Sequence, residues 1–201
     1  QKPRDPAHDH PQSPLAPKAL FEAALNAEKR GLTQTHEEAL KILEELAKTY
    51  PANPLVFQAR LRQGDILRDL GDFGLALNSY ENILRDFAGH PEAYRAEFGR
   101  AYCLSQQAAR DPARLSLAVA AFERLFDLPS IPVDARVEAG FNWALTLANA
   151  GQADRARQTY WLVVSRYLGD EENAARLHER GRYWMARTIF ELGSLLESTG
   201  E

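Results

Sequence analysis

The chain is poor in the residues and motifs that would define a chemical reaction. Its 201 residues include one cysteine, Cys103, so neither an intrachain disulfide nor a Cys-x-x-Cys site can form. No apolar run approaches the ~18–20 residues that a membrane-spanning helix needs. Gly-rich phosphate loops and nucleophile elbows are also missing. These absences argue against a disulfide scaffold, a membrane span, and the nucleotide-binding and hydrolase classes that those motifs define.

Two histidine-containing stretches come closest to a metal site, and each lacks a feature that metal binding requires. His8-Asp9-His10 lies in a proline-rich stretch that provides no fixed ligand geometry. His178-Glu179 begins like the helix of a zinc protease, but Arg182 stands where the second histidine ligand would be. Cys103 is expected to be a small buried residue of a helix. We therefore predict no catalytic residue, no metal, no cofactor and no enzyme activity.

The charge of the chain bears on its partners. The formal net charge is -4, hydrophobic residues make up 45% of the chain and charged residues 26%. These proportions are ordinary for a soluble globular protein. A mildly acidic chain lacks the clustered positive charge that nucleic-acid binding needs, so no nucleic-acid partner is expected.

Residues 1–17 differ in composition from the rest of the chain. They contain five prolines and almost no large apolar residues, so we predict a disordered tail followed by a helical domain over 18–201. The chain begins at Gln1 and not at methionine. This favours a processed protein or a fragment, with any targeting signal already removed.

From Lys18 onward, apolar residues recur at steps of three and four, and glycine or proline interrupts the pattern every 15 to 20 residues. No segment shows the alternation of a strand, so the predicted fold class is all-α. The connections between the predicted helices are short, which makes neighbours antiparallel. The predicted helices are 18–31, 36–50, 54–70, 73–88, 91–108, 113–127, 132–150, 153–168 and 172–198.

A three-residue pattern repeats in four of these helices. It consists of an alanine, an apolar or aromatic residue four positions later, and an aliphatic residue three positions after that. The alanines recur after 37, 42 and 38 residues, a period typical of helical repeats. The small alanine allows the two helices of a hairpin to approach closely. The four triplets are Ala39/Leu43/Leu46, Ala76/Tyr80/Ile83, Ala118/Phe122/Leu125 and Ala156/Tyr160/Val163. The helices that precede them, and the last helix, carry a small residue at the matching place, namely Ala27, Gly64, Gly99, Ala144 and Ala186.

These residues resemble the tetratricopeptide repeat family, with divergent repeats, over about residues 18–198. The clearest match is Gly64, Leu67, Gly71-Asp72-Phe73, Ala76 and Tyr80. The third repeat departs from the family by about seven extra residues, around Gln107 to Leu115. The resemblance implies a right-handed α-solenoid of about four hairpins and a final helix. These would cover residues 18–51, 54–88, 91–128, 132–168 and 172–198.

The resemblance also implies a binding site, because ligands of this family lie in the concave groove formed by the first helices. Arginines there suit carboxylates, so we predict a protein or peptide partner with acidic groups, anchored by exposed aromatic residues. The alternative is that Arg68 pairs with Asp65 or Asp72 and Arg187 with Glu191, or that the final helix covers the groove. The predicted groove residues are Gln58, Leu61, Asp65, Arg68, Arg100, Phe141, Leu145, Arg180, Tyr183, Arg187 and Phe190.

The predicted function is a non-catalytic scaffold or adaptor that binds a protein segment. The Tyr50-Pro51 ending and the Ala-x-x-x-Tyr spacing are similar to repeat proteins of the bacterial cell envelope, such as lipoproteins of outer-membrane assembly. This favours a periplasmic or cell-envelope location over the cytoplasm. The alternative is a regulatory or docking domain cut from a larger envelope protein, enzyme or transporter. The partner and the oligomeric state stay open at this point.

Overall fold

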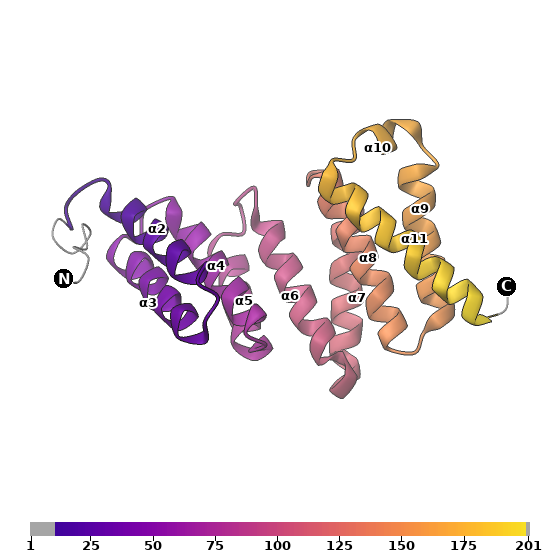
Figure 1. Ribbon diagram of the computed structural model, residues 1–201, viewed down its shortest axis with the longest axis horizontal. Coiled ribbons are helices and arrows are strands. Elements are labelled where there is room, and N and C mark those ends of the chain that lie inside the picture. Colours follow the sequence, from indigo (N-terminus) through magenta and orange to yellow (C-terminus); the bar gives the residue numbers. More distant parts are fainter. Residues whose placement is uncertain (1–10, 200–201) are drawn as a thin grey trace. The chain divides into compact units, whose positions relative to one another are not determined.

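The computed structural model describes residues 11–199, and every regular element within that range is helical (Figure 1). The predicted all-α class, a helical-repeat fold, is therefore confirmed. The elements are α2 (Ala16–Glu28), α3 (Thr33–Thr49), α4 (Leu55–Asp69), α5 (Phe73–Asp86), α6 (Ala93–Gln107), the 3-10 turn η1 (Ala108–Arg110), α7 (Pro112–Asp127), α8 (Val133–Asn149), α9 (Ala153–Leu168), α10 (Glu171–Ala175) and α11 (Glu179–Thr199).

The chain divides between Gly99 and Arg100, inside α6, into two compact units that we describe separately. In the N-terminal unit, α2 packs on α3 and α4 packs on α5, with α3 also contacting α4. In the C-terminal unit, α8 packs on both α7 and α9, and α11 packs on α8 and α9. Each unit is therefore built from antiparallel helix hairpins in a row.

Glycines in the left-handed conformation make the tight turns inside three hairpins. Gly31, Gly71 and Gly151 have φ angles of 70°, 80° and 74°. Residues that carry a Cβ rarely adopt this backbone conformation. After Gly71, the Asp72 side chain accepts a hydrogen bond from the Leu75 amide at 3.1 Å and caps α5. The Gly-Asp pair identified in the sequence thus ends one helix and starts the next.

In the N-terminal unit, the ring of Tyr80 is completely buried, at 0% exposure. A Cβ placed on Gly64 would lie 2.7 Å from this ring, and one placed on Gly99 would overlap it. The ring therefore fills the space between α4 and α6 because both helices carry a glycine there. The alanine of each predicted triplet is also fully buried, at 0% exposure for all of Ala39, Ala76, Ala118 and Ala156.

Enlarging these alanines tests the predicted register. Ala76→Leu and Ala156→Leu should each lower the free energy of unfolding by about 1–3 kcal/mol, because three extra heavy atoms have no space to occupy. Urea denaturation followed by circular dichroism measures the change. Leu75→Ala, at a position 53% exposed beside Ala76, is the control and should change stability by less than about 0.5 kcal/mol. Midpoints unchanged in both leucine variants would contradict the register.

Three expectations need correction. The first described helix begins at Ala16 and not at Lys18, and it buries both Ala16 and Pro17 of the predicted tail. Tyr50 also donates a hydrogen bond to the Pro11 carbonyl at 2.8 Å, so the tail's last residues contact the domain. Residues 1–10 of that tail lie outside the described range.

The other two corrections concern the final helix. The predicted helix 172–198 is interrupted, because α10 ends at Ala175 and α11 begins at Glu179. Ala186, expected at a close helix contact like Gly64, is exposed. The helix presents Met185, Thr188 and Leu192 to the core instead. The physical reason lies in the contacts that α11 makes with α8.

Candidate functional site

A hollow of about 100 Å³ lies on the first helices of the N-terminal unit. Three successive first helices, α2, α4 and α6, contribute residues to it. It contains Gln58, Leu61 and Asp65 of the predicted groove residues. The full lining is Phe21, Leu25, Gln58, Leu61, Arg62, Asp65 and Arg95.

The hollow has an apolar side and a charged side. Leu61 lines the hollow and is only 2% exposed, while Phe21 and Leu25 are half-buried on α2. These three residues provide an apolar surface that a partner side chain can contact. The charged side is formed by Arg62 of α4 and Arg95 of α6.

Both arginines already hold a carboxylate. The Arg62 Nε lies 2.7 Å from Glu28 Oε2, and an Arg95 nitrogen lies 3.5 Å from Glu92 Oε2. Gln58 also donates to Glu92, at 2.6 Å. Each arginine side chain keeps about two fifths of its surface exposed, at 40% for Arg62 and 41% for Arg95. The rim of the hollow is therefore a partly exposed row of paired charges.

Arg68, a predicted ligand contact, is engaged inside the fold. Its guanidinium lies 3.2 Å from Asp65 and 2.9 Å from Asp69. Tyr80 donates a further hydrogen bond to Asp65 at 2.8 Å. Burial acts to lower the pKa of Arg68, but the electrostatic interactions with Tyr80, Asp65 and Asp69 outweigh it and raise that pKa. The internal pairing with Asp65, considered as the alternative for this arginine, is thus present.

In the C-terminal unit, α11 covers the first-helix face of α8. The ring of Phe141 is 1% exposed, with its centroid 5.0 Å from Trp184 and 4.8 Å from the guanidinium carbon of Arg187. The Arg187 guanidinium therefore lies over aromatic rings. It does not form the ion pair with Glu191 that was the alternative expected from the sequence. Leu145 of α8 is half-buried beside the same cluster.

Two acidic residues of α8 hold the start of α11 in place. The His178 amide donates to Asp134 Oδ1 at 3.0 Å, and Arg180 forms an ion pair with Glu138. Gly181 has no Cβ, which lets Asp134 approach the backbone of α11 closely. As a result α11 packs more extensively on α8 than α4 does on α2, and this explains why Ala186 faces outward.

The predicted groove residues thus fall into separate groups. Gln58, Leu61 and Asp65 share the hollow, Arg68 sits beside it, and Arg100 lies partly buried on α6. In the C-terminal unit, Phe141 and Leu145 lie under α11, Arg180 and Arg187 bind residues of α8, and Tyr183 and Phe190 are 55% and 71% exposed.

Sequence reasoning missed Phe21, Leu25, Arg62 and Arg95. A signal was available for the first of these, because the repeat period of 37 residues places Phe21 at the position of Gln58. It also places Glu28 at the position of Asp65, and Glu28 pairs with Arg62. Arg95 and Leu25 occupy no predicted ligand position, so nothing in the repeat pattern identified them.

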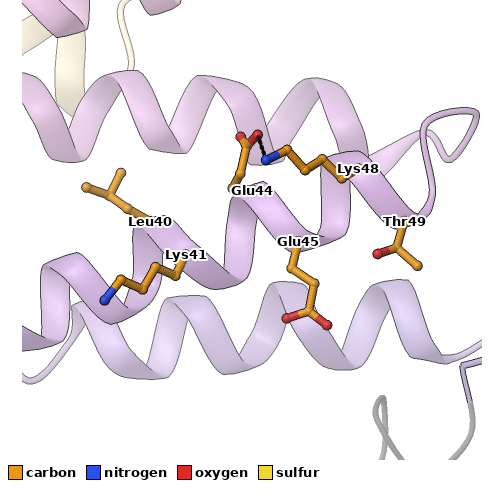
Figure 2. Close-up of a pocket in the computed structure, with 6 residues that line it drawn as sticks. All are labelled: Leu40, Lys41, Glu44, Glu45, Lys48 and Thr49. Atoms are coloured by element: carbon orange, nitrogen blue, oxygen red, sulfur yellow. Dashed lines mark ion pairs between the residues drawn. The ribbon is translucent and has the colours of Figure 1, made fainter.

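A second, larger hollow of about 510 Å³ lies along the outer surface of α3. Figure 2 shows that its six lining residues all project from this one helix, and a dashed line joins Glu44 to Lys48, whose ion pair measures 3.1 Å. Hydrogen bonds from Gln63 and Lys48 lower the pKa of the Glu44 carboxyl. One helix alone forms a shallow surface, so we assign no site to it.

Between residues 11 and 199, no group of three or more His, Cys, Asp or Glu residues could hold a metal ion. Cys103 is 0% exposed, as expected for a small buried residue. None of the described helices is both long enough and apolar enough to cross a membrane.

Comparison with known proteins identifies the fold. No protein-family model and no curated protein matches the chain. A crystal structure of MamA protein is similar at a TM-score of 0.59 and 16% identity, covering 92% of each chain. The TPR-like repeats of a putative kinesin light chain from Podosopora anserina give 0.58 and 19%, covering 90% of this chain and 93% of that one. A tetratricopeptide repeat protein from Parabacteroides merdae ATCC 43184 gives 0.57 and 19%, covering 92% and 67%.

These similarities concern the fold, since the identities are low. The fold is that of the tetratricopeptide-like helical-repeat proteins, as the repeated triplets predicted. Such a fold is used for many unrelated roles, so the role of this chain must be argued from its own surfaces.

Proposed function

We propose that the chain is a non-catalytic interaction scaffold whose first-helix hollow binds a segment of another protein. Stacked helical repeats generally present such surfaces to protein partners. The observation that carries the proposal is the hollow itself, in which three successive first helices place a few apolar residues beside two partly exposed arginines.

The size of the hollow defines what enters it. Its volume of about 100 Å³ is well below the ~300–1,000 Å³ of small-molecule pockets. The hollow therefore accepts one small aliphatic side chain against Leu61, while the rest of the partner segment lies over the helices. An extended or a helical segment can present a side chain in this way.

The arginines give the partner its charge. A guanidinium has five N–H donors, and Glu28 lies against only the Nε of Arg62. A carboxylate of the partner can bind the remaining donors of Arg62 and those of Arg95 in a bidentate fashion. We therefore keep the acidic partner predicted from the sequence, and assign its recognition to Arg62 and Arg95, whose side chains are the more exposed. Arg68 is only 27% exposed, and Arg187 lies over the Phe141 ring.

Capture of the partner tests the location of the site. A photo-crosslinking residue at Gln58 should capture the partner in cells, whereas the same residue at Lys41, on the outer surface of α3, should not. Equal capture from both positions would remove the hollow from consideration.

Titration of the captured partner tests the chemistry. Arg62→Ala with Arg95→Ala should weaken binding at least tenfold and flatten its salt dependence, because charged hydrogen bonds contribute about 1.5–3 kcal/mol each. Arg85→Ala is the matched control, since this arginine is 69% exposed on α5 and pairs with its neighbour Asp86. An affinity that does not respond to the double variant would contradict the proposal.

The alternative function places the same hollow in a docking domain of a larger envelope protein, enzyme or transporter. The partner segment would then belong to the same polypeptide or complex. It would still present an acidic group and a small aliphatic side chain to the hollow. The cell-envelope location belongs to this proposal too, and fractionation of cells that produce the protein tests it directly.

A further inference from the structure

We infer that α11 pairs in an antiparallel manner with α11 of a second copy of this chain. The contact surface is a row of residues that we call the α11 seam, namely the exposed Tyr183, Ala186 and Phe190 and the half-buried Gly193. The inference does not depend on the hollow of the N-terminal unit, because it uses only residues of α11.

The first observation is a glycine that the fold of one copy does not need. Gly64, Gly99 and Gly140 lie well inside helices, and a Cβ on any of them would collide with a packed side chain. Gly193 also lies deep inside a helix, yet no packed neighbour lies within 4 Å of the place where its Cβ would be. Glycine lowers helix stability relative to alanine. In the other three positions, glycine lets a neighbouring side chain approach the helix backbone closely. Gly193 would do the same for a side chain that comes from a second chain.

The second observation is the exposure of large apolar residues along the same face. Tyr183 is 55% exposed, Phe190 is 71% exposed, and Ile189 on the edge of the seam is 47% exposed. Ala186 lies between them and is exposed as well. The seam residues follow one another at steps of three, four and three, which is the spacing of a helix face that packs against another helix.

The third observation is the alternation of size along the seam. Large and small residues follow in the order Tyr183, Ala186, Phe190, Gly193. When two such helices cross antiparallel at Thr188, residues equally far before and after it face each other. Phe190 then lies over Ala186 of the second copy, and Tyr183 lies over Gly193. Large against small is the arrangement that fills a helix interface without voids.

Two copies of the α11 seam do not fit each other when the helices run parallel. Two parallel copies would set Phe190 against its own equivalent and Gly193 against its own equivalent, giving a collision at one level and a gap at the other. In the antiparallel pair, Glu179 lies level with Glu197 of the second copy, and Arg182 lies within about one turn of that Glu197; all three residues are exposed. The direction therefore rests on the sizes of the seam residues and not on charge.

The amount of surface sets the strength of the pair. An aromatic side chain offers about 200 Å², so the exposed parts of Tyr183 and Phe190 provide roughly 250 Å² per copy. Even with Ile189 and the flanking residues, the total is below the ~1,200 Å² of a stable complex. We therefore expect a reversible dimer with a dissociation constant on the order of 100 µM.

Sedimentation equilibrium of the full chain, from about 10 µM to about 1 mM, tests the inference. The mass should rise from that of a monomer toward that of a dimer.

Gly193→Leu and Phe190→Ala should each weaken the dimer at least tenfold. Gly193→Leu should leave the melting temperature of the monomer unchanged or higher, because the replaced glycine has free space around it. Loss of the dimer in this variant therefore cannot come from unfolding.

A size exchange tests the antiparallel direction. Ala186→Phe alone should weaken the dimer, because two rings would meet, whereas Ala186→Phe with Phe190→Ala should restore it to within about threefold. Trp161→Ala, at an aromatic residue 62% exposed on α9, is the control and should have no effect. A monomer throughout the range, a dimer indifferent to Gly193→Leu, or a dimer tightened by Ala186→Phe would each overturn the inference and leave the seam to a different partner or direction.

Discussion

Tyr80→Ala should lower the free energy of unfolding of the N-terminal unit by about 3–5 kcal/mol, the range found when a buried aromatic is truncated. The ring is 0% exposed and fills the space that Gly64 and Gly99 leave open. Because glycines have no side chains, neither helix can move atoms into the cavity without a backbone shift. The variant also removes the hydroxyl that donates to Asp65.

Tyr80→Phe separates the ring from the hydroxyl. It keeps the packing and removes one hydrogen bond to a carboxylate, so the loss should be smaller, about 1.5–3 kcal/mol. All three tryptophans follow Gly99, so their fluorescence reports the C-terminal unit, while circular dichroism reports both units. The effect of both variants should therefore appear in circular dichroism. An equal loss in the alanine and phenylalanine variants would show that the ring is not the main support of α4 and α6.

The sequence was enough to predict the hairpins because their requirements are local. A small residue must face an aromatic one where two helices cross, and Gly64, Ala76 and Tyr80 satisfy that within 17 residues of chain. The turn at Gly71 needs a positive φ, which again is a property of one residue. Such short-range patterns predicted the helix order and the buried alanines, with boundaries that differ by a few residues.

The final helix could not be predicted in the same way. Its rotation depends on Asp134 and Glu138, more than 40 residues earlier, which bind His178 and Arg180. No local pattern contains that information, so Ala186 was assigned to a close contact that it does not make. The same limit applies to Arg68, where the sequence suggested Asp65 as a pair but gave no sign that the Tyr80 hydroxyl joins them.

Two phenylalanines from the predicted groove show what this limit means for function. Phe141 and Phe190 were both predicted to contact a ligand, yet one is 1% exposed and the other 71% exposed. Phe141 packs against Trp184, Arg187 and Tyr160, with ring centroids 5.0 Å from Trp184 and 6.0 Å from Tyr160. It therefore joins α11 to the core of the C-terminal unit, whereas Phe190 adds nothing to that core.

Phe141→Ala should accordingly cost about 3–5 kcal/mol of the free energy of unfolding, and Phe190→Ala less than about 0.5 kcal/mol. Urea denaturation followed by tryptophan fluorescence measures both, because Trp184 lies against the Phe141 ring. The protein should be kept at low micromolar concentration, where self-association through the α11 seam is negligible. The two variants make the same chemical change on neighbouring helices, so each serves as the control for the other. Equal losses would mean that α11 is not packed on α8 as described. A stable Phe141→Ala variant would mean that the first-helix face of α8 is open to a ligand after all.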